Sequence, residues 1–216
     1  MNHQQLKARQ RRERATHSPS TALRVHRALS WLGRAEQLGD DPDTQFVLLW
    51  IAFNAAYARD IEEGARRSER LTFKGLLDEL IALDGERAIE NLVWAEFPGS
   101  IRVVLDNVYI FNDFRVHHSG RLSADDWRRA FSNANRAAVR ALGRSDTTSV
   151  PSIVLSRLYV LRNQLVHGGA TWGGKVNRAQ VRDGASLLAK LMPRVITIIL
   201  DHPDHDLGRA CYPVIT

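Results

Sequence analysis

The chain of 216 residues has a single cysteine and no long apolar run, and each shortage excludes a class of protein. Cys211 alone cannot form an internal disulfide, so we expect a reducing compartment rather than a disulfide-stapled secreted fold. No run reaches the roughly 18 apolar residues of a membrane span. The N-terminus is basic but lacks the apolar centre of a secretory signal. We therefore expect a cytoplasmic protein that does not enter the membrane.

Strand patterns and several common catalytic motifs are also missing. The sequence contains no Gly-rich phosphate loop, no zinc-finger spacing and no Gly-x-Ser-x-Gly motif. No segment shows the convincing apolar–polar alternation of a half-buried strand. Apolar residues instead recur at three-and-four spacing, most clearly at Phe46, Trp50, Phe53 and Tyr57. The sequence predicts an all-α bundle of about seven to eight helices.

The length fits one domain with an extension at its N-terminus. Residues 1–19 carry five Lys and Arg in a polar setting and end at Ser18-Pro19. We interpret 1–19 as a basic flexible arm, either a solvated extension or a tail that touches nucleic acid. Residues 20–216 are interpreted as a single helical domain.

The net charge of +6 is unevenly distributed along the chain. Residues 1–34 hold eight basic and one acidic residue, whereas residues 35–156 hold 14 basic and 19 acidic. Between Arg157 and Arg194 there are seven basic residues, opposed only by Asp183. A basic field of this kind favours a polyanionic substrate, although a solvated helix face has the same pattern.

The run from Arg162 to Gly169 carries the chemistry. An apolar helix ends in Arg162-Asn163-Gln164-Leu165-Val166-His167 and is closed by Gly168-Gly169. Arginine offers a planar donor fork for phosphate, and histidine transfers protons near neutral pH. The spacing alone is weak evidence, because chance gives about one Arg-x4-His match in such a chain. A second match, Arg12 and His17, lies in the basic arm.

Helix geometry constrains how the motif could act. Asn163 and His167 are four residues apart and share a helix face, so Asn163 can orient the imidazole or a scissile phosphate. Arg162 lies about 140° around the helix from His167, so one helix does not make the two side chains converge. A second copy of the chain, or unwinding at Gly168, would bring them together.

An all-α domain with an Arg-Asn-x-x-x-His run at a helix end resembles the HEPN superfamily, whose motif lies between the last two core helices. The segment from Leu49 to Tyr57 is similar to the upstream aromatic helix of bacterial HEPN proteins of the ApeA-like kind. The resemblance covers roughly residues 20–200. One position departs from the pattern: HEPN toxins paired with a nucleotidyltransferase often have a tyrosine where this chain has Gly169.

The resemblance implies a metal-independent endoribonuclease without a cofactor, acting as a toxin or phage-defence effector. Two protomers would form one composite site, in which the ribose 2′-OH attacks the neighbouring phosphodiester, and an antitoxin or regulatory protein could be a further partner. In that site Arg162 would stabilise the phosphorane, His167 would transfer a proton and Asn163 would orient the imidazole or the scissile phosphate. The alternative is a non-catalytic module that binds a nucleotide or a protein.

Several further residues are candidates from their own context. Asn54 lies in the aromatic helix and either reaches the motif or is a core amide. The Asp201–Asp206 segment resembles a metal-ligand composition but is better interpreted as a solvated turn. The candidates for RNA binding are the basic residues around the motif: Arg157, Lys175, Arg178 and Arg182.

Overall fold

The computed structural model describes residues 1–58, 69–96 and 98–212, and the described part is helical without a strand apart from one isolated bridge residue, which confirms the all-α prediction. It contains ten α-helices, more than the predicted seven to eight, because α1 and α7 were not expected from the sequence. The α-helices are α1 (His3–Glu13), α2 (Pro19–Gln37), α3 (Pro42–Tyr57), α4 (Glu69–Leu83), α5 (Ala88–Asn91), α6 (Pro98–Asp106), α7 (Asn112–His118), α8 (Ala124–Gly143), α9 (Ser149–Val166) and α10 (Arg178–Asp201). Single tighter or wider turns are η1 (Arg14–Thr16), η2 (Leu92–Glu96) and η3 (Val108–Ile110).

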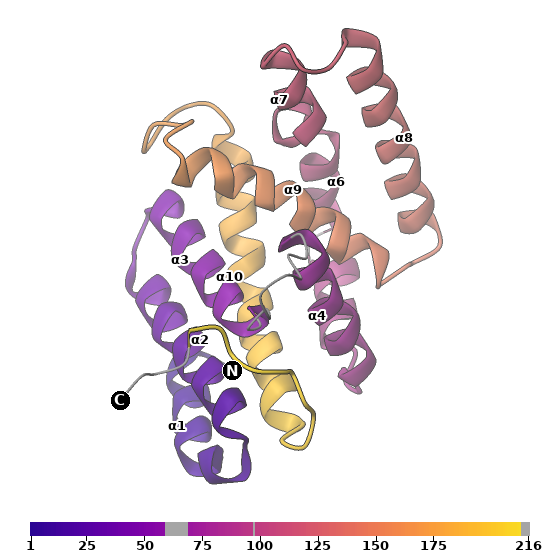
Figure 1. Ribbon diagram of the computed structural model, residues 1–216. Coiled ribbons are helices and arrows are strands. Elements are labelled where there is room, and N and C mark those ends of the chain that lie inside the picture. The colour runs from indigo at the N-terminus through magenta and orange to yellow at the C-terminus, as the bar shows by residue number, and fades with distance from the viewer. Residues whose placement is uncertain (59–68, 97, 213–216) are drawn as a thin grey trace.

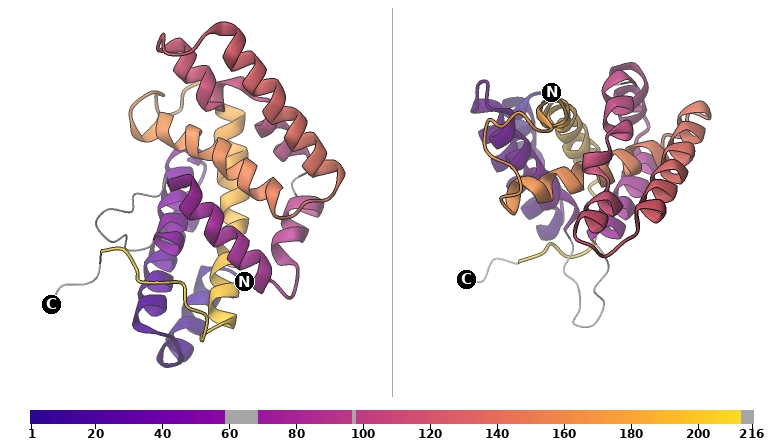
Figure 2. Two further views of the ribbon diagram at one scale, coloured as in Figure 1. Left: turned by 45° about the vertical axis from the view of Figure 1, so that its right-hand side comes forward. Right: turned by 90° about the horizontal axis from the view of Figure 1, so that it is seen from above.

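The helices form two groups that are joined by α9. Helices α1, α2 and α3 pack around the long α10, and α6, α7 and α8 form the second group. Helix α9 contacts α3 on one side and α6 and α8 on the other. Figure 2 shows the two groups diverging on either side of α9 when the molecule is seen from above. The helix that ends in the Arg162–His167 run is therefore the one that links both groups.

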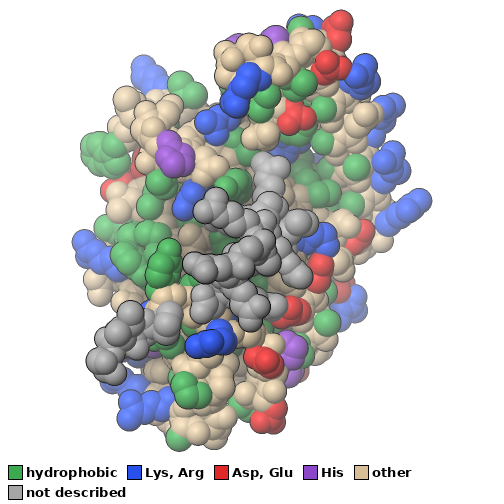
Figure 3. Space-filling model, in the orientation of Figure 1, with side chains coloured by type: hydrophobic (Ala, Val, Ile, Leu, Met, Phe, Trp, Pro, Cys, Tyr) green, Lys and Arg blue, Asp and Glu red, His purple; other side chains and the backbone are tan. Residues whose placement is uncertain are grey.

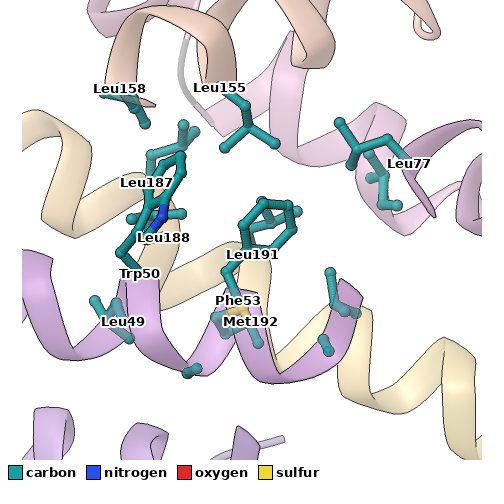
Figure 4. Close-up of a cluster of buried hydrophobic side chains, with 14 of the residues drawn as sticks. Leu49, Trp50, Phe53, Leu77, Leu155, Leu158, Leu187, Leu188, Leu191 and Met192 are labelled. Carbon is teal, nitrogen blue, oxygen red and sulfur yellow. The ribbon is translucent and has the colours of Figure 1, made fainter. Parts of the chain in front are cut away.

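The core lies where α3, α9 and α10 meet. Aromatic side chains of α3 pack under α9 and beside α10 (Figure 4), and a Cβ at Gly184 would lie 2.8 Å from the ring of Phe46. Glycine at this position therefore lets α10 approach α3 closely. The buried side chains in this region include Leu49, Trp50, Phe53, Leu155, Leu158, Leu188, Leu191 and Met192.

The prediction of a flexible arm over residues 1–19 is wrong for most of its length, because residues 3–13 form α1. Leu6 of α1 is fully buried, and Arg9 forms an ion pair with Asp201 of α10 at 2.6 Å. Asn2 and Gln5 form a capping box that satisfies the first backbone donors of the helix. A single buried leucine gives no visible periodicity in the sequence, so the docking of α1 could not be read from it.

The second Arg-x4-His match, Arg12 and His17, is structural. His17 is buried, and its ring nitrogens contact the backbone oxygens of Glu13 and Leu200 at 2.9 and 3.3 Å.

Among the described helices, none combines the length and the apolar character needed to span a bilayer.

Arg24 of α2 holds the C-terminal segment against the bundle. Its guanidinium is buried and donates to five backbone carbonyls, two at the end of α3 and three in the segment after α10. The carbonyl acceptors belong to Ala56, Ala58, Leu207, Gly208 and Arg209.

Candidate functional site

The motif occupies the C-terminal end of α9, where the helix becomes exposed. Leu155 and Leu158 face the core of the first group, and Arg157 and Val160 face the second. Four side chains of the last turn of the helix spread over an arc of about 140° around its axis. Val166 and His167 are exposed there, and Arg162 and Asn163 are partly buried. Arg162, Asn163, Val166 and His167 therefore lie together at the end of α9, where the helix becomes exposed.

Arg162 and Asn163 are in direct contact. The Nη1 atom of Arg162 donates to Oδ1 of Asn163 at 2.9 Å, which fixes the guanidinium beside the amide. The exposed imidazole of His167 has no hydrogen-bond partner in the described part of the chain, and its backbone N–H donates to the carbonyl of Asn163 at 3.1 Å. The structure thus brings Arg162 and Asn163 together and places His167 on the following turn.

Helix α9 ends at this site in a Schellman motif. His167 is the last half-helical residue, and Gly168 adopts a left-handed φ of 70°. Gly169 N–H donates to the carbonyl of Gln164 at 2.7 Å, and Gly168 N–H donates to that of Leu165 at 3.3 Å. Both bonds satisfy carbonyls that the helix end would leave unpaired, as Gly168-Gly169 predicts. Unwinding at Gly168 is therefore not how this structure presents the motif.

Replacing Gly168 with alanine should lower the free energy of unfolding by about 1 kcal/mol, because a left-handed φ is costly for a residue with a Cβ. Urea denaturation measures the change. Gly143→Ala is the matched control, since Gly143 is exposed at the end of α8 with open space around it, and this variant should lose no stability. Equal effects of the two substitutions would contradict a conformational role for Gly168.

The loop after the motif is attached to the N-terminus of α3. Trp172 donates its indole N–H to Asp41 at 3.2 Å, and Arg178 forms an ion pair with Asp43. Hydrogen bonds from the Thr44 side chain, its backbone N–H and Trp172 hold the pKa of Asp41 below its ordinary value against the opposing effect of burial, with a further contribution from the charge of Arg178. Two aspartates that begin α3 therefore fix the segment that follows His167.

Gln164 and Asn177 fix the same loop from the other side. Gln164 Nε2 donates to the carbonyl of Tyr109 at 2.8 Å, and Asn177 Nδ2 donates to Gln164 Oε1 at 3.0 Å. Sequence reasoning missed Gln164, Asn177 and Asp43 as positioning residues. Their partners are far away in the chain, so no local spacing could have identified them.

The supporting residues predicted from the sequence fall in different places. Arg157 is only 4% exposed, and its guanidinium lies 4.3 Å from the ring centre of Phe111 and 5.3 Å from that of Phe131. The prediction that Arg157 binds RNA is therefore wrong. Its side chain instead packs between α9 and the second helix group. Such a role depends on two distant phenylalanines that the sequence does not place beside Arg157.

Of the other RNA-binding candidates, Lys175 and Arg182 are exposed near the motif, whereas Arg178 is neutralised by Asp43. Within the described residues, Asn54 makes no hydrogen bond to the motif, and its Oδ1 atom is a buried acceptor without a partner there. The N-terminal end of α3 lies near the loop after the motif, because Asp43 pairs with Arg178. Asn54 belongs to the opposite end of α3, which points away from the end of α9 (Figure 1).

Apolar side chains are unusually exposed around the motif. Val166 is 49% exposed and Trp172 is 76% exposed, and Tyr109 and Val176 are also largely in solvent. Figure 3 shows apolar, basic and histidine side chains close together at the upper left, over the end of α9 and the loop that follows it. Exposed apolar residues that gather in one place typically mark a surface that another molecule covers.

This arrangement supplies one permanent cation, one amide and one imidazole, which suit phosphate contact and proton transfer. Among the described residues, no three His, Cys, Asp or Glu side chains are placed to hold a metal ion. In the Asp201–Asp206 segment, His202 contacts the carbonyl of Ile198 and His205 lies 3.7 Å from Glu79. No protein-family model, curated protein or solved structure matches this chain.

Proposed function

We propose that the protein is a metal-independent endoribonuclease whose active site forms when two copies bring the free faces of α9 together. The observation that carries the proposal is the shared open surface of Arg162, Asn163 and His167, with exposed Val166 between them. Exposed Lys175 and Arg182 nearby favour a polyanionic substrate. The resemblance of the motif to that of HEPN ribonucleases agrees with this chemistry.

The proposed reaction is a transesterification within the RNA strand. The ribose 2′-oxygen forms a bond to phosphorus as the bond from phosphorus to the 5′-oxygen breaks. The imidazole of His167 from one copy accepts the 2′-OH proton and passes it to the leaving 5′-oxygen. Arg162 stabilises the charge on the phosphorane through its donor fork, oriented by its hydrogen bond to Asn163. The products are a 2′,3′-cyclic phosphate and a 5′-hydroxyl.

A two-copy site follows from the geometry of α9. Arg162 and His167 are separated by about 140° around one helix, so one protomer directs them away from each other rather than toward one phosphate. A twofold contact places the Arg162 of one copy opposite the His167 of the other. Val166, which lies between them on the helix surface, would be buried near the centre of this contact.

Val166→Glu is expected to weaken the dimer at least about tenfold, because like charges would meet near the twofold axis and lose water. Size-exclusion chromatography with light scattering measures the loss, and cleavage should fall with it. Val139→Glu is the matched control: Val139 is 65% exposed on α8, far along the chain from the motif, and should change neither property. A dimer that survives Val166→Glu unchanged would place the contact elsewhere.

The direct test is cleavage of a structured RNA by the purified chain in excess EDTA, with His167→Ala purified alongside. Cleavage by the wild type, none by the variant, and products ending in 2′,3′-cyclic phosphate would support the proposal. Equal cleavage by both would point to a contaminating nuclease. Cleavage by neither would favour the alternative, a module that binds nucleotide or protein. As a toxin or defence effector, the wild type should also slow cell growth on expression.

A further inference from the structure

A groove between α1 and α2, away from the motif, is lined by basic side chains. The groove has a volume of about 240 Å³ and is lined by nine described residues, none of which is acidic. In Figure 1, α1 and α2 lie at the lower left, whereas the end of α9 lies at the upper left. The lining side chains that carry the argument are His3 and Lys7 of α1 and His26, Ser30, Arg34 and Gln37 of α2.

Two rows of side chains run along the helices that border this groove, which is lined by His3 and Lys7 of the first row and by all four members of the second. On α1, His3, Lys7 and Arg11 are spaced by four residues, which places them on one helix face, and Arg14 follows at the start of η1. On α2, His26, Ser30, Arg34 and Gln37 repeat the same spacing. Successive side chains of a row advance by about 6 Å, so the cations follow a line rather than meet at one point.

Close packing of the two helices shapes the groove. A Cβ at Gly33 would lie 2.6 Å from the His3 ring, so the glycine allows this imidazole to lie against α2. Leu29 lies at the base of the groove and is buried. Gln10 of α1, which is also buried, lines the groove beside Leu29.

The cations along the groove are little opposed by acidic side chains. Lys7, Arg11 and Arg14 are exposed and have no ion pair in the described part of the chain. Glu13 is occupied by Arg9 and Arg12. Glu36, which accepts a hydrogen bond from the backbone N–H of His3, is the acidic residue that borders the groove. The local field is therefore positive along Lys7, Arg11 and Arg14.

We infer that this groove binds the phosphodiester backbone of a nucleic acid. A line of cations suits a chain of phosphates, and each contact would release counterions from the strand. An anionic membrane surface fits less well, because Leu6 is the only large apolar residue of α1 and it is fully buried against the bundle. The groove needs no cleavage chemistry, so this inference stands apart from the proposed ribonuclease activity.

The test measures binding of a fluorescein-labelled single-stranded oligodeoxynucleotide to the full chain by anisotropy. DNA lacks the 2′-OH that the proposed cleavage requires, so binding is read without cleavage. In the double variant Lys7→Gln, Arg34→Gln, the dissociation constant at 0.1 M salt should rise about tenfold. The plot of log affinity against log salt should become shallower by about 1.4, since each single-strand phosphate contact contributes about 0.7.

Arg136→Gln, Arg140→Gln is the matched control, because it removes two exposed cations four residues apart on α8. This control should leave the dissociation constant within about twofold, and an RNA of the same sequence should bind like DNA in the His167→Ala background. If both double variants weakened binding equally, the loss would follow from net charge alone, and the inference would be overturned. Full displacement by inorganic phosphate at equal ionic strength would also overturn it, as would groove-dependent binding to phosphatidylserine vesicles without binding to the oligonucleotide.

Discussion

His167→Ala should lower the rate of RNA cleavage by about 10²- to 10⁴-fold, the range that a positioned proton-transfer group contributes. Loss of the Arg162 guanidinium should cost about 10²- to 10³-fold, because the charge on the phosphorane would lose its nearest counter-charge. Arg162→Lys should not restore the rate, since an ammonium group cannot reproduce the planar fork that also contacts Asn163. Single-turnover cleavage of a labelled RNA measures all three.

The matched control for His167 is His118→Ala, which removes an exposed histidine at the end of α7. This variant should cleave RNA at the wild-type rate. Thermal melts of each variant show whether the fold is intact, and a loss of activity that follows a loss of folding would not count. Full activity in a folded His167→Ala protein would exclude the proposed mechanism.

Mixing the two inactive variants tests whether the site is shared between copies. An Arg162→Ala protomer keeps His167, and an His167→Ala protomer keeps Arg162, so a mixed dimer retains one complete pair across the contact. Random pairing of equal amounts gives about half mixed dimers, and activity should reappear in proportion. If no activity returns although subunit exchange is shown by differently tagged copies, each protomer must act alone.

Arg24→Met should lower the free energy of unfolding by at least about 3 kcal/mol, the largest stability effect that we expect from a single side chain in this fold. The buried guanidinium donates to carbonyls at the end of α3 and in the segment after α10, and methionine leaves those acceptors without their donor. Urea denaturation measures the change. Limited proteolysis should cut residues 203–212 sooner than in the wild type.

Arg27→Met is the control for Arg24, because Arg27 donates to the carbonyls of Cys211 and Tyr212 in the same segment but is only partly buried. Its expected cost is about 1 kcal/mol, since water can replace an exposed donor. If the two variants lost similar amounts of unfolding free energy, burial of Arg24 would not explain its contribution to stability.

Local patterns predicted those parts of the fold that depend on neighbours in the chain. The aromatic spacing from Phe46 to Tyr57 predicted α3, and Gly168-Gly169 predicted the end of α9, because periodicity and left-handed caps act over a few residues. The docking of α1 through Leu6 was not predictable, since one leucine among charged residues gives no pattern.

The same division holds for the candidate site. The sequence placed Arg162, Asn163 and His167 at the end of one helix, and that end is the exposed end of α9. The burial of Arg157 between Phe111 and Phe131, and the ion pair of Arg178 with Asp43, join residues from distant segments. Only the packed structure separates these two arginines from the exposed Lys175 and Arg182.

The order of the helices along the chain has a consequence for synthesis on the ribosome. Helix α3 is made early, yet its apolar face packs against α9 and α10, which are the last helices of the described chain to emerge. Until then the first helix group lacks α10, around which its helices pack. The ion pair between Arg178, the first residue of α10, and Asp43 has also not formed, so the loop after His167 is not yet attached to α3. A nascent chain without α10 would therefore hold an unassembled motif, and the proposed activity would depend on α10 having packed against α3.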